Sequence, residues 1–344
     1  MKVIINEPDT WRKPNTHHIE VLKNSWYKQL VLLQNLITEE TVNFYSSKGI
    51  ITMHLPVTTG TISSPMGRGS DSKPVKVNLE GKETYLADSM QFLLEYGCRL
   101  TDKGCYYVMP SFRGEKADER HLCQFYHSEA EIPGTLEDVM ILVEEYIKYL
   151  SRKIIDKMGE QLLTTIGDIS HIEKIANCAK NFKKITFDEA EKILKEKFPR
   201  NINEYIEYQD GWRNITRKAE RALIEAFDGI VWITNYDELA VPFYQKSDVT
   251  INGTAKNADL LMGIGETVGC GERHELYSDL LEALKKHEVS TNEYEWYVDM
   301  KKLFPLQTAG FGMGIERFLM WVLKANDIRN MQICLRFNGE EVVM

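Results

Sequence analysis

The chain has 344 residues, a net charge of −9 at pH 7 and 43% hydrophobic residues, so we expect a packed soluble core in one large domain or two ordinary ones. The acidic balance argues against general coating of nucleic acid, and no apolar run approaches the roughly 20 residues that span a bilayer, so we expect no membrane partner. Six cysteines without a CxxC pair, behind an N-terminus without a signal-peptide pattern, predict reduced thiols in the cytoplasm and give no zinc signature.

Hydrophobic periodicity predicts both helices and strands along the chain. Apolar residues at helical spacing fill residues 19–42, and a glycine break then precedes a strand that closes at Pro56. A Gly/Ser/Pro-rich loop at 63–74 leads to an alternating hairpin at 75–86. Further strands are expected at 106–116, 120–132, 229–236, 258–272 and 310–314, and further helices at 135–165, over most of 170–225, and from 315. Because several strands are joined by hairpins, we expect a mainly antiparallel sheet with helices around it.

The stretch "SFRGEKADERHLCQF" gathers charge at a predicted hairpin. On a strand, Arg113 and Glu115 would share one face, and the turn would bring Arg120 and His121 back toward them. A guanidinium on a sheet suits bidentate phosphate binding, and a carboxylate accepts from an exocyclic amine. A solvated hairpin with cross-strand ion pairs explains the same residues.

The stretch "ADLLMGIGETVGCGERHE" places Asp259 and Glu266 on either side of a glycine turn. Paired carboxylates suit Mg²⁺, which usually takes further oxygens from a bound phosphate. A plain acidic hairpin, with Arg273 as a surface partner at the start of a helix, remains the alternative.

The stretch "AGFGMGIERFLMW" has glycines at 310, 312 and 314, on one face of a predicted strand that runs into a helix. Glycine weakens a strand and often marks close approach of another backbone or of a ligand. A partner strand and a flat ligand both explain the pattern. Glu316 and Arg317 begin the helix, and an arginine placed over a glycine strand can stack on a planar ring while reaching phosphate.

Together and in this order, these stretches resemble the catalytic core of class II aminoacyl-tRNA synthetases, in the asparaginyl/aspartyl branch. "GIITMHLPV", "FRGEKADERHLCQF" and "GFGMGIERF" are similar to the three motifs of that family, and the first motif builds a dimer interface. The resemblance covers roughly residues 25–335 and implies an α+β fold with a six- to seven-stranded, mostly antiparallel sheet surrounded by helices. It makes residues 1–24 an N-terminal extension and 25–344 a catalytic domain with a helical insertion at about 150–225.

The resemblance also implies a site for each substrate. Adenine would lie on the glycine strand between Phe125 and Arg317. Arg113 and Arg317 would be the catalytic residues, with Arg113 on the α-phosphate and with Arg120 or His121 at the γ-phosphate. The implied ATP-binding residues are Arg113, Glu115, Arg120, His121, Phe125, Gly312, Gly314 and Arg317. The implied substrate contacts are Gln91, Arg273 and Asp71, and the implied Mg²⁺ ligands are Asp259 and Glu266.

Two departures from the family pattern bear on the reaction. Family members carry an N-terminal anticodon-binding barrel, for which residues 1–24 are too short. The loop at 63–74 has Met66 and Gly67 where the family usually has a Glu for the substrate's α-ammonium, so either Asp71 replaces it or the amino group is bound differently.

We therefore expect an ATP- and Mg²⁺-dependent, AMP-forming ligase that works as a homodimer. It would activate an aspartate- or asparagine-type carboxylate and pass it to ammonia or an amine without tRNA. A reduced asparaginyl-tRNA synthetase that charges tRNA is the second hypothesis, and a catalytically inactive regulatory paralogue is the third.

Overall fold

The computed structural model describes residues 6–63, 68 and 72–341. In this part of the chain the main sheet has eight strands. In spatial order they are β1 (Ile51–Thr52), β5 (Cys105–Phe112), β6 (Gln124–Pro133), β13 (Thr308–Gly314), β12 (Gly265–Glu272), β11 (Asn257–Met262), β10 (Ile230–Thr234) and β7 (Lys184–Thr186). The pairs β1–β5 and β10–β7 are parallel, and the other pairs are antiparallel. The predicted α+β fold is confirmed, with short edge strands β1 and β7 extending the sheet beyond the expected six or seven strands.

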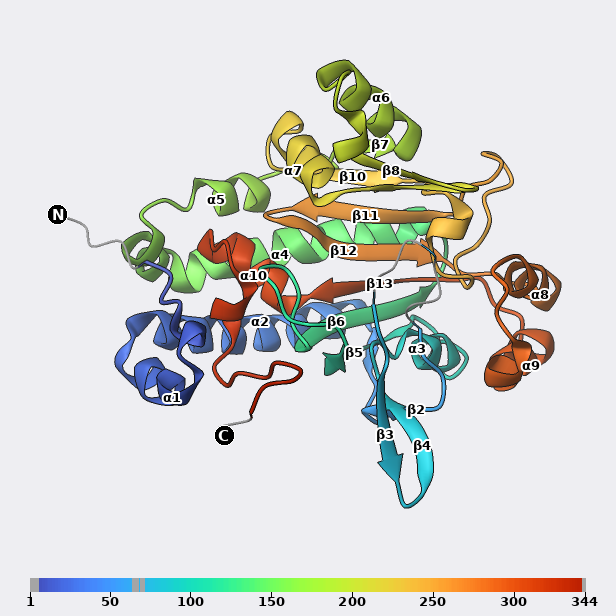
Figure 1. Cartoon of the computed structure of the whole chain (residues 1–344), viewed down its shortest axis with the longest axis horizontal. Coiled ribbons are helices and arrows are strands. Elements are labelled where there is room, and N and C mark those ends of the chain that lie inside the picture. The colour runs from blue at the N-terminus through green and yellow to red at the C-terminus, as the bar shows by residue number, and fades with distance from the viewer. Residues whose placement is uncertain (1–5, 64–67, 69–71, 342–344) are drawn as a thin grey trace.

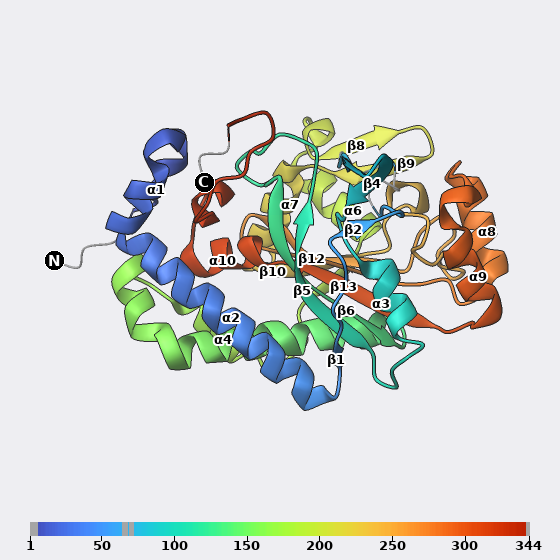
Figure 2. The same ribbon diagram turned by 90° about the horizontal axis from the view of Figure 1, so that it is seen from below.

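Helices surround this sheet in Figure 1. The helices in the described residues are α1 (Pro14–Lys23), α2 (Ser25–Lys48), α3 (Gln91–Gly97), α4 (Leu136–Ile166), α5 (Ser170–Ala176), α6 (Phe187–Lys197), α7 (Arg217–Ala226), α8 (Tyr277–Lys286), α9 (Glu295–Leu303) and α10 (Ile315–Leu323). Figure 2 shows α2 and α4 side by side along the sheet. No helix of the described residues is both long enough and apolar enough to cross a membrane.

The long helix α4 covers one face of the sheet because its sequence defines both of its ends. Thr135 and Asp138 form a reciprocal capping box at the start, and Gly167 ends the helix with φ 78°. Its apolar stripe packs on the sheet, where Tyr146 of α4 meets Phe311 of β13 at 6.2 Å between ring centroids. Side chains alternate along a strand, so the neighbouring glycines of β13 face the opposite side.

On that opposite side, α6 and α7 cover the far end of the sheet. Val231 and Ile233 of β10 and Leu261 of β11 pack there in a second apolar cluster with Leu223 of α7. The predicted insertion at 150–225 contains the end of α4, then α5, β7, α6 and α7, together with a hairpin of β8 (Ile206–Gln209) and β9 (Trp212–Ile215). The segment is therefore mostly helical, and it also supplies one edge strand of the main sheet.

Two local predictions can be compared directly with the backbone. The hairpin at 75–86 is confirmed: β3 (Val75–Leu79) and β4 (Lys82–Leu86) pair across Glu80 and Gly81, which both have positive φ. A short strand β2 (Thr58–Thr59) joins β4.

The strands predicted at 106–116 and 120–132 are shorter at the turn, because β5 ends at Phe112 and β6 begins at Gln124. The Asp118 carboxylate accepts hydrogen bonds from the backbone N–H groups of Arg120 and His121. These groups are therefore not available for pairing between strands.

Candidate active site

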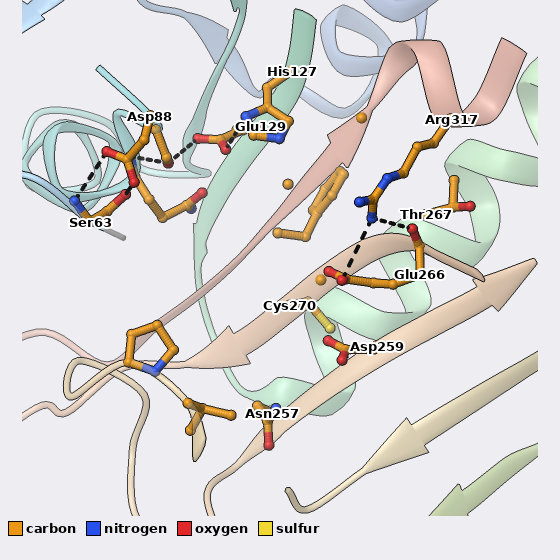
Figure 3. A pocket seen from close by; sticks show the side chains of 18 of the residues that line it. Ser63, Asp88, His127, Glu129, Asn257, Asp259, Glu266, Thr267, Cys270 and Arg317 are labelled. Carbon is orange, nitrogen blue, oxygen red and sulfur yellow. Dashed lines mark hydrogen bonds and ion pairs between the residues drawn. The ribbon is translucent and has the colours of Figure 1, made fainter. Parts of the chain in front are cut away.

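A cavity of about 400 Å³ lies over the middle strands of the sheet, on the face that carries the β13 glycines. Its volume is within the range of small-molecule sites. Figure 3 shows Arg317 and Glu266 facing each other at one side of the cavity, with Ser63 and Asp88 at the other. Of the predicted site residues, those that line it are Gln91, Arg113, Arg120, His121, Phe125, Asp259, Glu266, Arg273, Gly312, Gly314 and Arg317.

At Gly310 and Gly312 of β13, glutamate side chains of the neighbouring strand β6 already fill the space above the backbone. A Cβ on Gly310 would lie 1.8 Å from Glu131 Oε2, and a Cβ on Gly312 would lie 2.9 Å from Glu129 Oε1. A Cβ on Gly314 would meet only Arg317, at 3.8 Å, which is ordinary van der Waals contact. The glycine strand therefore leaves an open floor at Gly314, beside Arg317.

Arg317 extends from the first turn of α10 toward the β11–β12 hairpin. Its Nη1 donates to the backbone oxygen of Glu266 at 2.7 Å and lies 3.7 Å from Glu266 Oε2. Burial lowers the pKa of Arg317, against the attraction of Glu266. An anionic ligand bound here would form charge-assisted hydrogen bonds with Arg317, because its guanidinium is only loosely paired with Glu266.

Asp259 and Glu266 stand on adjacent strands and converge above Gly269. A Cβ at that glycine would lie 2.9 Å from Glu266 Oε1 and 3.5 Å from Asp259 Oδ1. Burial and the neighbouring Glu266 raise the pKa of Asp259 well above its usual value. A divalent cation would relieve this repulsion, so the pair fits Mg²⁺. Within the described residues no group of three or more His, Cys, Asp or Glu side chains is arranged to hold a metal ion, so further ligands would come from phosphate or water.

The segment that follows β5 brings Arg113 to the cavity and the start of β6 brings Phe125, with the guanidinium carbon 5.5 Å from the ring centroid. The expectation that Arg113 and Glu115 share a strand face is wrong, since both follow the end of β5. Glu115 accepts from the backbone N–H of Lys73 at 3.0 Å and lies outside the cavity wall. For Glu115 to contact adenine, the segment that follows β5 would have to change its conformation. The predicted contact therefore stays a proposal.

Arg120 and His121 are both held by α7. Arg120 Nη2 pairs with Glu220 Oε2 at 2.5 Å, in a buried contact beside Gly265. His121 Nδ1 lies 3.1 Å from both Asp118 Oδ1 and Arg217 Nη2. Burial, followed by the charge of Arg317, lowers the pKa of His121. These contacts place both residues at the same end of the cavity as Arg317.

At the inner end of the cavity, Glu131 of β6 lies buried behind the wall and holds two residues that line it, Arg273 and Gln91. Arg273 reaches Glu131 through Nε–Oε1 at 3.2 Å and Nη2–Oε2 at 3.1 Å, and Gln91 Nε2 donates to Oε2 at 2.5 Å. Gln245 Oε1 accepts from Arg273 Nη1 at 3.0 Å. Arg273 is thus a buried residue that follows β12 directly, and not a surface partner at a helix start, since α8 begins only at Tyr277.

Glu129 was missed by the sequence reasoning and lies two residues before Glu131, on the same face. Its carboxylate accepts from Ser89 Oγ at 2.7 Å and from the Tyr107 hydroxyl, and His127 Nδ1 lies 3.0 Å away. Burial alone would raise the pKa of Glu129, but His127 and these hydrogen bonds outweigh it and lower the pKa. The alternation in "HSEAE" was the available signal, because it puts His127, Glu129 and Glu131 on one side of the strand.

At the opposite wall, Asp88 accepts from the backbone N–H of Ser63 at 3.2 Å and from its hydroxyl at 2.9 Å. Burial raises the pKa of Asp88. The predicted substrate contact Asp71 lies outside the described residues, as do Met66 and Gly67.

Comparison with known families shows the family of the chain. The family model described as tRNA synthetases class II (D, K and N) matches residues 12–334. The chain belongs to this family. The resemblance of the three motifs to a class II synthetase core is thereby confirmed.

Among curated relatives of this synthetase-family chain, the probable cytoplasmic asparagine–tRNA ligase of Encephalitozoon cuniculi is 32% identical over 259 residues, which are 74% of this chain and 56% of the relative. The asparagine–tRNA ligase of Malacoplasma penetrans is 32% identical over 318 residues, which are 88% of this chain and 69% of the relative. The chain thus spans little more than half the length of the first of these relatives.

The fold of a class II synthetase is shared with solved structures. The asparaginyl-tRNA synthetase of Pyrococcus horikoshii, complexed with asparaginyl-adenylate, has a TM-score of 0.85 at 24% identity and covers 95% of this chain and 72% of that one. The asparaginyl-tRNA synthetase of Entamoeba histolytica in complex with asparaginyl-adenylate has a TM-score of 0.82 at 22% identity, with 98% and 74% covered. At these identities the likeness concerns the fold.

Proposed function

We propose that this class II synthetase-family chain activates the α-carboxylate of asparagine with ATP and passes the acyl group to tRNA. The observation that carries the choice of amino acid is the charge at the inner end of the cavity. Glu129 is held ionised beside His127, and the guanidinium of Arg273, which lines the same cavity, is already hydrogen-bonded to Glu131.

A side-chain carboxylate would be repelled at this wall, because aspartate adds a charge of the same sign as Glu129. The amide of asparagine brings N–H donors and no charge, which suits a carboxylate acceptor. Aspartate to asparagine is the simplest case of the tRNA-independent ligase expected from the sequence, and Glu129 disfavours that substrate. An inactive regulatory paralogue is disfavoured by the arginines and acids that still surround the cavity.

In the proposed reaction, a carboxylate oxygen of asparagine attacks the α-phosphorus of ATP and pyrophosphate leaves. Arg113 would stabilise charge on the α-phosphate, and Phe125 and Arg317 would hold adenine over the open floor at Gly314. His121 and Arg120 would meet the outer phosphates, which their position in the cavity lining supports. Such a step needs orientation and charge stabilisation, with no covalent bond to the protein.

Asp259 and Glu266 would hold Mg²⁺, as their convergence and mutual repulsion support. When bound, the cation supplies positive charge to the phosphate oxygens. The chain's own arginines would bind and orient the phosphates.

The acceptor is the second part of the proposal. Relatives that match most of the chain are named asparagine–tRNA ligases, which supports tRNA. In the transfer step, a ribose hydroxyl of tRNA would attack the acyl carbonyl carbon, and AMP would leave.

Ribonuclease-treated enzyme tests the acceptor. We expect AMP release with asparagine to stop at the first turnover after treatment and to resume when purified tRNA is added. Multiple turnovers with ammonium and no tRNA, yielding an acid-stable amide from aspartate, would instead establish the tRNA-independent ligase.

A further inference from the structure

A buried row of charges connects the inner cavity wall with α9, a helix outside the cavity. Lys301 of α9 forms an ion pair with Glu95 of α3, and both side chains have 0% exposure. Glu95 Oε1 in turn lies 4.0 Å from Arg273 Nε, which bonds Glu131 on its other side. Figure 1 shows α8 and α9 together at the end of the sheet opposite α1.

A fully buried lysine needs an explanation, because lysine is almost never fully buried without a partner. Replacing a buried ion pair by apolar residues is often neutral or stabilising, so the pair is weak evidence for a purely structural role. The four side chains, Lys301, Glu95, Arg273 and Glu131, are two bases and two acids, so the row contains equal numbers of each. The removal of Lys301 alone would leave an excess buried carboxylate beside Arg273.

The position of Arg273 depends on which of its two acidic neighbours it bonds. With Glu131 it makes three hydrogen bonds, two from Nε and one from Nη2, whereas Glu95 lies 4.0 Å from the same Nε and makes no hydrogen bond with it. Glu95 Oε1 is instead occupied by the Tyr297 hydroxyl at 2.6 Å, and its charge is balanced by Lys301. Lys301 and Tyr297 thus remove the competition for the guanidinium.

We propose that Lys301 is a positioning residue for the amino-acid site: by holding Glu95, it keeps Arg273 bonded to Glu131 and facing the cavity. This inference rests on the proposed function, because it takes Arg273 to contact the amino-acid substrate. Lys301 itself touches neither substrate.

Pyrophosphate exchange, with the KM values for asparagine and ATP measured separately, tests this role. Lys301→Met leaves Glu95 unbalanced, so we expect the KM for asparagine to rise about tenfold or more while the KM for ATP stays within about twofold. Tyr297→Phe frees the oxygen nearest Arg273 without changing the charge, and should raise the asparagine KM about threefold. Lys302→Met, an exposed neighbour on α9, is the matched control and should leave both KM values unchanged.

The double variant Lys301→Met/Glu95→Gln separates positioning from general stability. It removes both charges together, so the asparagine KM should return to within about threefold of the starting enzyme. A double variant as impaired as Lys301→Met, or single variants with an unchanged asparagine KM, would overturn the inference while exchange by the unmodified chain still supports the proposed function. If the unmodified chain gives no exchange with any amino acid, the proposed function fails and this inference fails with it.

Discussion

The proposed function makes Arg317 the side chain on which binding of ATP depends most. Its Nη1 is held by a backbone carbonyl and is only weakly paired with Glu266, so the guanidinium is available to a ligand. We expect Arg317→Ala to lower pyrophosphate exchange about 100- to 1,000-fold, the effect of losing one strong preorganised donor. Its melting temperature should stay close to that of the unmodified chain. Arg12→Ala, at an exposed surface ion pair, is the control and should keep full activity. Near-normal turnover by Arg317→Ala would show that ATP does not bind at this end of the cavity.

Glu316, the neighbour of Arg317, makes stability depend on pH. Both of its carboxylate oxygens accept the backbone N–H of Tyr126, and burial raises its pKa from 4.5 to about 7. The folded state therefore binds this proton more tightly than the unfolded state, so its contribution to stability falls as pH rises from about 4.5 to about 7. A shift of that size corresponds to about 3 kcal/mol.

Glu316→Gln removes this titration while keeping one oxygen acceptor for Tyr126. Urea unfolding of both proteins at pH 5 and pH 8 measures the difference. We expect the unmodified chain to lose about 2.5 kcal/mol relative to Glu316→Gln between these pH values, because part of the loss is already complete at pH 5. Two parallel stability profiles would mean that Glu316 titrates normally.

At the scale of a single element, strand β13 carries three glycines with different surroundings. Gly310→Ala would force a Cβ onto Glu131 and the backbone oxygen of Ala130, so its melting temperature should fall by several degrees. Gly314→Ala finds room in the ligand-free protein and should melt like the unmodified chain. If Gly314→Ala keeps its melting temperature and loses ATP binding, the added methyl group occupies space that the ligand needs. Equal melting temperatures for the two variants would contradict the crowding above β13.

The same elements show which features a sequence can predict. The β11–β12 hairpin and the passage from β13 into α10 follow from alternation and glycine spacing, which are local properties. Residues 113–116 and 120–123 were predicted as strand and are not. Their fold depends on contacts that the local pattern does not carry, namely Asp118 accepting backbone N–H groups and Arg217 of α7 pairing with Asp118. Glu129 was passed over because its role comes from tertiary neighbours, above all His127 and Tyr107. The local sequence pattern thus predicts the helices, the strands and most site positions. Contacts between segments that are distant in sequence determine which side chains pair with one another.

At the scale of the whole molecule, we propose that two copies associate through the α2–β1 region. This segment has the helix–strand pattern of the family's dimer motif, and it exposes Val31, Leu32, Val42 and Ile51. An obligate interface would bury more than about 2,000 Å² in total. Light scattering at micromolar concentration should therefore give twice the chain mass of 39.8 kDa. A stable monomer would show that this face serves another purpose.

Activation of asparagine with ATP is the central claim, and amino-acid-dependent exchange of labelled pyrophosphate into ATP tests it most directly. With Mg²⁺ and purified chain, we predict that asparagine supports exchange with a kcat/KM about 100-fold or more above that for aspartate, because Glu129 repels a second carboxylate. Exchange that prefers aspartate, or that does not respond to asparagine, would contradict the account.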